Sequence, residues 1–296
     1  MSSITLVSAI YSDNVNSYYG GRGRGLAEYY PSLVNISRLG LNLVLYCDPS
    51  QVDAIKETVG PLFKQGLTVV GYELKQFKYY EFWQNWKQMR PELGDRNEIL
   101  CFSKLFWLQQ TIQNCHSSFY LWIDAGLTHH GIFPEKFGGV ELRITYPPGK
   151  FHPLNKENIF NPTLTQRILT ELNSQPEKLW FLATSMHGMN HYLQEITSNV
   201  MKQTCPLIRE HLVGGLFGGT AVAIQMLLDK FEPLLETVLA LNTFYCFEEH
   251  LFSAINATYP SYFKLKTFES FWFHLPGEIT SYLEKDVNSF YKLFLP

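Results

Sequence analysis

Short apolar runs separated by segments of helical character are the feature of this sequence that most limits its fold. Several of the runs are apolar at every position, as strands covered on both faces must be. Strand–helix alternation of this kind predicts an α/β fold with a mainly parallel twisted sheet flanked by helices. The predicted strands are residues 4–10, 41–47, 67–74, 119–123, 142–146, 179–184, 212–217 and 262–268, and the predicted helices are residues 51–58, 98–114, 162–173, 221–241 and 247–257.

Length and composition bound the class of protein. The chain has 296 residues, of which 46% are hydrophobic and 17% charged, enough for one large domain or two modest ones, and no repeat or linker divides it. A net charge of −3 without a long Lys/Arg block disfavours a nucleic-acid partner. Five widely spaced cysteines without a C-x-x-C motif fit free thiols in a reducing cytoplasm. The first residues lack a signal peptide's basic region, and no stretch approaches the roughly 20 apolar residues of a membrane span.

The stretch WIDAG, residues 122–126, carries an acid at the end of a predicted strand. In parallel α/β sheets, ligands bind beyond the carboxyl ends of the strands, which favours Asp124 as a binding or catalytic residue. Ala125 and Gly126 are small enough to let a ligand pass close to the backbone. An aspartate that caps the turn after a strand is at least as common, so the motif alone leaves both interpretations open.

Two glycine-rich stretches are candidate binding segments. In YYGGRGRG, residues 18–25, Leu26 stands where a dinucleotide fingerprint needs its third glycine, so Arg22 and Arg24 remain as candidate phosphate contacts or as part of a solvated basic loop. In HLVGGLFGGT, residues 211–220, Gly214 and Gly215 would allow a close approach to the backbone. A bulged strand or a strand-to-helix turn explains the second stretch equally well.

Acids and histidines near the C-terminal end supply the remaining candidates. The stretch CFEEH places Glu248 and Glu249 beside a histidine, where a carboxylate could act as a general base or face a developing cation. Acids at an exposed helix start are the alternative. His274, in WFHLPG, is a candidate metal ligand, although a lone histidine among aromatic residues is more often part of a core. Two adjacent histidines in the middle of the chain, His129 and His130, could also bind a metal, but they lack a companion at ligand spacing.

The order of these stretches resembles the bacterial HtrL/YibB-like glycosyltransferase family. The matching segments are GRG at residues 21–23, NEILCFSKLFWLQQTI with Lys104, WIDAG, VGGLFGGT and FEEHLFSAI, and they extend to about residue 270. The resemblance implies a GT-A-like fold and transfer of a sugar from a nucleotide-diphosphate sugar to a glycan or a lipid-linked acceptor, during surface polysaccharide or lipooligosaccharide assembly. It also implies a cytoplasmic protein with possible peripheral contact at the inner face of the membrane.

Residue roles follow from that resemblance. Asp124 would contact the donor, with Arg22, Arg24 and Lys104 near its phosphates and Gly126, Gly214 and Gly215 lining its site. Glu249, or Glu248, would face the anomeric carbon. Asp124 and His274 would hold a divalent metal, Mn²⁺ or Mg²⁺, an expectation left open because Gly126 replaces the second acid of the Asp-x-Asp pattern. The chain is expected to be a single domain, with residues 1–126 as the nucleotide-binding half and residues 127–296 as the acceptor and catalytic half.

Two rival classes are kept beside the transferase. A catalytically degenerate sugar- or nucleotide-binding protein would share the fold, and the missing second acid is its best argument. A phosphohydrolase that uses Asp124 as its nucleophile is disfavoured, because that class needs a second acid two residues further on, where Gly126 stands.

Overall fold

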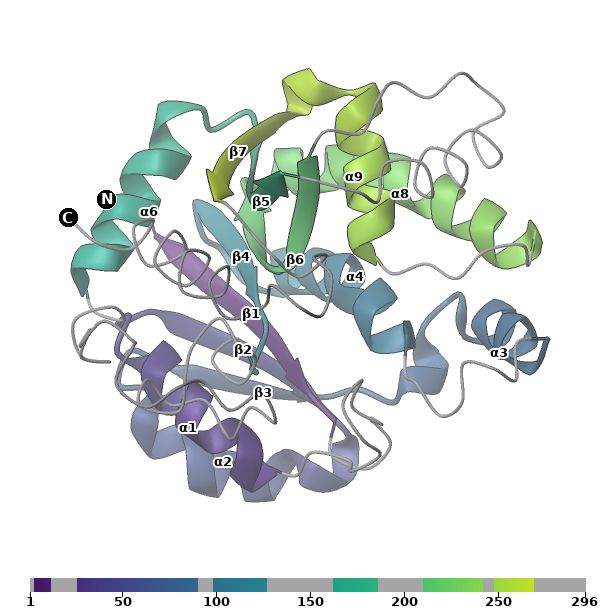
Figure 1. Ribbon diagram of the computed structural model, residues 1–296. Coiled ribbons are helices and arrows are strands. Elements are labelled where there is room, and N and C mark those ends of the chain that lie inside the picture. Colours follow the sequence, from purple (N-terminus) through teal and green to yellow (C-terminus); the bar gives the residue numbers. More distant parts are fainter. Residues whose placement is uncertain are drawn as a thin grey trace, which may run out of the picture.

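One twisted sheet forms the centre of the molecule (Figure 1). The computed structural model describes residues 3–11, 26–89, 98–126, 162–185, 210–241 and 248–268. Within these ranges seven strands pair in the order β3-β2-β1-β4-β6-β5-β7, and only β6 runs against its neighbours. The predicted mainly parallel sheet is therefore confirmed. The strands are β1 Ile4–Ile10, β2 Asn42–Cys47, β3 Leu67–Gly71, β4 Phe119–Ile123, β5 Leu179–Ser185, β6 Glu210–Gly219 and β7 Phe263–Phe268.

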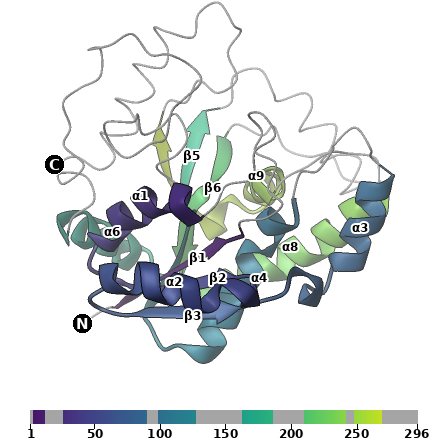
Figure 2. The same ribbon diagram turned by 90° about the horizontal axis from the view of Figure 1, so that it is seen from below.

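Helices cover both faces of the sheet. They are α1 Leu26–Ser37, α2 Val52–Val59, α3 Tyr80–Gln88, α4 Glu98–Asn114, α6 Pro162–Ser174, α8 Ala221–Leu241 and α9 Glu248–Thr258. The two views show α1, α2 and α6 on one face, and α3, α4, α8 and α9 on the other (Figures 1 and 2). The sequence did not predict α1 or α3. The predicted strand at residues 142–146 lies outside the described residues.

Successive side chains of each central strand pack alternately into two separate hydrophobic cores, one on each face of the sheet. In β4, Tyr120 and Trp122 pack under α4, α8 and α9, whereas Leu121 and Ile123 pack against the side of α1, α2 and α6. Successive side chains of a strand point to opposite faces of the sheet, so both must be apolar when helices cover both faces. This requirement explains the uninterrupted apolar run before Asp124.

The order in which the chain adds strands to the sheet reverses between the parallel neighbours β1 and β4. From β1 the chain moves outward to β2 and β3, and β4 then pairs with the other side of β1. Such a switch point leaves a crevice beyond the carboxyl ends of the two strands, which is where α/β sheets of this kind bind ligands. Asp124 follows β4 directly at this place.

A bulge in β6 lies beside the same edge. Phe181 of β5 pairs with Phe217, but the next residue, Leu182, pairs with Val213, so the register shifts between them. Bulges often lie next to active sites, where they remove backbone groups from the regular ladder and redirect side chains. Gly214 and Gly215 fall within the skipped stretch. The described residues include no helix that is long and apolar enough to cross a membrane.

Candidate active site

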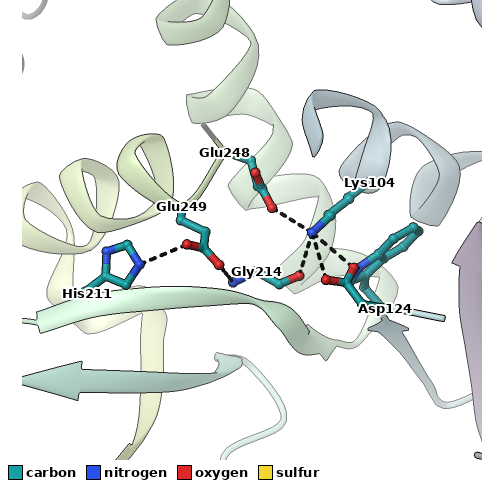
Figure 3. Close-up of polar contacts among 7 residues, drawn as sticks. Lys104, Asp124, His211, Gly214, Glu248 and Glu249 are labelled. Carbon is teal, nitrogen blue, oxygen red and sulfur yellow. Dashed lines mark hydrogen bonds and ion pairs between the residues drawn. The ribbon is translucent and has the colours of Figure 1, made fainter. Parts of the chain in front are cut away.

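Four elements meet at the carboxyl edge of the sheet, and three of them bring charged side chains there (Figure 3). Asp124 follows β4, Lys104 comes from α4, and Glu248 and Glu249 open the first turn of α9. Gly214 of the β6 bulge lies between them. The backbone N–H of Asp124 donates to the Gly215 carbonyl at 2.9 Å, which continues the β4–β6 ladder by one residue and fixes the start of the turn.

Lys104 is the centre of the first half of the site. Its Nζ lies 2.6 Å from Glu248 Oε1 and 3.0 Å from Asp124 Oδ1. It also donates to the Gly214 carbonyl at 3.0 Å. The side chains of Lys104 and Glu248 are only 9% and 3% exposed, whereas that of Asp124 is 39% exposed. A buried ammonium therefore lies beneath a carboxylate that solvent, or a ligand, can reach.

Asp124 is held from a second side by Trp122. The indole Nε1 donates to Asp124 Oδ1 at 2.7 Å, and the two residues lie on the same face because they are two positions apart at a strand end. Lys104 Nζ lies 5.6 Å from the centre of the same indole ring, within cation–π range. These contacts fix the orientation of the Asp124 carboxylate before any ligand arrives.

Glu249 forms the second half of the site with His211, from the start of β6. His211 Nε2 lies 2.9 Å from Glu249 Oε2, and the backbone N–H of Gly214 donates to Glu249 Oε1 at 2.7 Å. Both carboxylate oxygens are thus engaged, yet the Glu249 side chain remains 31% exposed. Glu248 and Glu249 point to different partners because adjacent residues on a helix are about 100° apart.

Gly214 connects the two halves through its backbone. Its carbonyl accepts from Lys104 and its N–H donates to Glu249. A Cβ at this position would overlap the Glu248 carboxylate and lie 3.1 Å from Glu249 Cγ. The close approach that the glycine pair predicted is made, among the described residues, by the acids of α9.

Burial and charge set the protonation of the cluster. Burial alone would lower the pKa of Lys104, but Asp124 and Glu248 hold it well above its ordinary value, so the ammonium stays charged. Burial raises the pKa of Glu248, against the effect of Lys104. Burial would also raise the pKa of Glu249, but His211 and the Gly214 N–H lower it to about 2. Glu249 is therefore ionised at neutral pH.

The structure brings together five of the site residues that the sequence predicted. Lys104, Asp124, Gly214, Glu248 and Glu249 share one cluster (Figure 3). Gly215 adjoins it through its carbonyl, and Gly126 is buried in the turn that follows Asp124. Arg22, Arg24, His129, His130 and His274 lie outside the described residues.

Sequence reasoning missed two contributors, His211 and Trp122. His211 is the first residue of the glycine-rich stretch, residues 211–220, and Trp122 is the first residue of WIDAG. Both stretches were selected for their other residues. The period of two along a strand was the available signal for Trp122, since it places that ring on the Asp124 side. The pairing of His211 with Glu249 joins residues 38 positions apart and had no local signal.

The donor set around Asp124 does not fit a resident divalent metal as it stands. Within the described ranges, no group of three or more His, Cys, Asp and Glu side chains is arranged to hold one. Asp124 is the predicted metal ligand in these ranges, and its Oδ1 already accepts from Trp122 and contacts Lys104.

Comparison with known proteins shows which fold the chain has. No family model matches the chain, and no curated protein matches its sequence. Among solved structures, core-mannan synthase A from Aspergillus fumigatus, in a form with manganese and GDP, is similar over 100% of this chain and 86% of its own, with a TM-score of 0.53 at 7% identity. Mouse xyloside xylosyltransferase 1 gives a TM-score of 0.49 at 12% identity, over 96% of this chain and 93% of its own. The similarity to core-mannan synthase A shows that the chain has the α/β fold of GT-A glycosyltransferases.

Proposed function

We propose that this protein is a glycosyltransferase that moves a sugar from a nucleotide-diphosphate sugar to a glycan or lipid-linked acceptor. The observation that carries the proposal is the pair of partly exposed carboxylates, Asp124 and Glu249, fixed by buried partners beside the switch point of a GT-A-like sheet. Donor binding at this edge suits the fold, because ligands of open α/β sheets bind beyond the strands' carboxyl ends.

Asp124 is proposed to orient the donor. An ionised carboxylate accepts hydrogen bonds from sugar or ribose hydroxyls, and its fixed direction reduces the entropy lost when the donor is positioned. Lys104 beneath it offsets part of the negative charge of the cluster. Arg22 and Arg24 are proposed to add the positive charge that a departing diphosphate needs.

Glu249 is proposed to face the anomeric carbon. With a pKa of about 2, this carboxylate is a weak base, so the structure favours electrostatic stabilisation of positive charge over removal of the acceptor's proton. His211 and Gly214 would hold the carboxylate in place. Glu248 is assigned to positioning Lys104, because its side chain is 3% exposed and bonded to the ammonium.

The finer features of the proposal follow the sequence resemblance. They are membership of the HtrL/YibB-like bacterial family, a role in polysaccharide or lipooligosaccharide assembly, and a cytoplasmic location with contact at the inner face of the membrane. The single-domain division into a nucleotide-binding half, residues 1–126, and an acceptor half, residues 127–296, belongs to the same proposal.

The test is incubation with a panel of nucleotide sugars, with and without candidate acceptors, while the release of nucleoside diphosphate is followed. The proposal predicts release from at least one donor that accelerates with an acceptor. A protein that binds a nucleotide sugar in a thermal-shift assay but never releases the diphosphate would support the alternative, a degenerate binding protein.

A further inference from the structure

We infer that the oxygens of Asp124, Gly214 and Glu248 form a cation site, and that the ammonium of Lys104 permanently fills it. Oxygens of three residues surround Lys104 Nζ. Glu248 Oε1 lies at 2.6 Å and the Gly214 carbonyl at 3.0 Å, and Asp124 contributes Oδ1 at 3.0 Å and Oδ2 at 3.4 Å. An ammonium carries three N–H donors, so this shell can use all of them. Carboxylate and carbonyl oxygens are also the ligands that Mg²⁺, Mn²⁺ and Ca²⁺ prefer.

The three residues that supply these oxygens come from three separate elements. Asp124 follows β4, Gly214 lies in the β6 bulge, and Glu248 opens α9. The bulge is what frees the Gly214 carbonyl for this role, since an unbroken ladder would commit it to a neighbouring strand. Convergence of three elements on one cation is the arrangement by which metal ions stabilise protein sites. Here the cation is attached to the chain.

Glu248 takes the place of the acid that the sequence lacks. Gly126 stands where an Asp-x-Asp pattern would have its second carboxylate. The partner carboxylate of Asp124 instead comes from α9, on the other side of Lys104 Nζ (Figure 3). With one ammonium between two carboxylates the charge of this group is −1, whereas a divalent cation in the same place would bring it to zero.

Lys104 therefore keeps this site closed to metal ions. A divalent cation would have to displace the ammonium of a side chain that is 9% exposed and makes two ionic contacts. The carboxylate pair is then assembled without metal, and a metal that accompanies a nucleotide donor would not replace Lys104. Removing the ammonium should open a metal site made of Asp124, Glu248 and Gly214.

The experiment compares Mn²⁺ binding by the wild type, Lys104→Ala, and the double variant Lys104→Ala/Asp124→Asn, without nucleotide. Electron paramagnetic resonance titration counts the bound ions. We expect Lys104→Ala to bind one Mn²⁺ more than the wild type, at least about 10-fold more tightly than the wild type binds any ion at that position, and the double variant to lose it. Lys87→Ala is the matched control, because Lys87 contacts one buried carboxylate, Glu98, at 3.4 Å.

Equal Mn²⁺ counts in wild type and Lys104→Ala would overturn the inference, as would an extra ion that persists in the double variant. If Lys104→Ala does not fold in EDTA, added Mn²⁺ should restore a cooperative thermal transition, and failure to restore it would also overturn the inference. None of these measurements requires turnover. The cation site and the proposed transferase activity therefore stand or fall separately.

Discussion

At the scale of single residues, the two exposed carboxylates differ in what holds them. Asp124 contacts a buried lysine and an indole N–H, whereas Glu249 contacts a histidine and a backbone N–H. Such fixed surroundings pre-organise both groups, since neither must reorient when a ligand binds. Mutations that keep shape but remove charge are the appropriate probes.

Asp124→Asn should lower transfer by about 100-fold or more, because it removes the charge that orients the donor. The fold should survive, since the amide oxygen still accepts from Trp122 Nε1. Steady-state release of nucleoside diphosphate measures the first effect and a thermal melt the second. Unchanged turnover would return Asp124 to the role of a turn residue.

Glu249→Gln should lower kcat by about 100-fold while KM for the donor changes little, because the carboxylate acts on charge that develops in the transition state. Glutamine keeps an acceptor for the Gly214 N–H, so α9 stays in place. Glu57→Gln, on the exposed surface of α2, is the matched control. A loss of donor affinity without loss of kcat would move Glu249 from the reacting centre to the donor pocket.

At the scale of elements, the contact between the β6 bulge and the start of α9 builds the site. Gly214→Ala should destabilise the protein by about 1–3 kcal/mol, because its Cβ would overlap the Glu248 carboxylate, which Lys104 fixes. Gly60→Ala is the control, since a Cβ there meets nothing within 4 Å. Denaturant unfolding of both variants tests this. Equal stabilities would show that the start of α9 can shift freely.

The helix α9 also carries a group that should make stability depend on pH. Burial, aided by the neighbouring His211, lowers the pKa of His250 to about 4. A histidine that titrates near 6.5 in the unfolded chain and near 4 in the native one favours unfolding as pH falls through this window. His250 should therefore lower the free energy of unfolding by roughly 2 to 3 kcal/mol at pH 4.5 relative to pH 8.

His250→Asn should remove that part of the pH dependence. Denaturant unfolding at pH 8 and pH 4.5 would show a smaller difference in free energy for the variant than for the wild type. If both proteins lose the same stability on acidification, His250 is not the group responsible.

Elements with strong periodicity could be predicted from the sequence, and those shaped by tertiary contacts could not. The bounds of α4, α8 and β4 agree with the prediction because their apolar patterns are long or uninterrupted. Helix α1 was missed because Pro31 lies inside it and disfavours a helix locally, although Leu33 and Ile36 are fully buried. Helix α3 was missed because its sequence is largely polar and only Trp86 is buried.

At the scale of the whole molecule, the sheet order explains how distant motifs form one site. Residues 104, 124, 214 and 248 meet because β6 pairs with β4 and α9 packs beside β6. The sequence could predict that Asp124 ends a strand. It could not predict that β6 runs antiparallel, and this direction is what brings the Gly214 bulge to the Asp124 end of β4.

Release of nucleoside diphosphate from a panel of nucleotide sugars by the wild type and by Asp124→Asn tests the proposed transferase activity most directly. The wild type is expected to turn over at least one donor, and the variant to do so about 100-fold more slowly while it still unfolds in one cooperative thermal transition. Equal turnover by the two proteins, or no binding and no turnover of any donor by the wild type, would contradict the proposal.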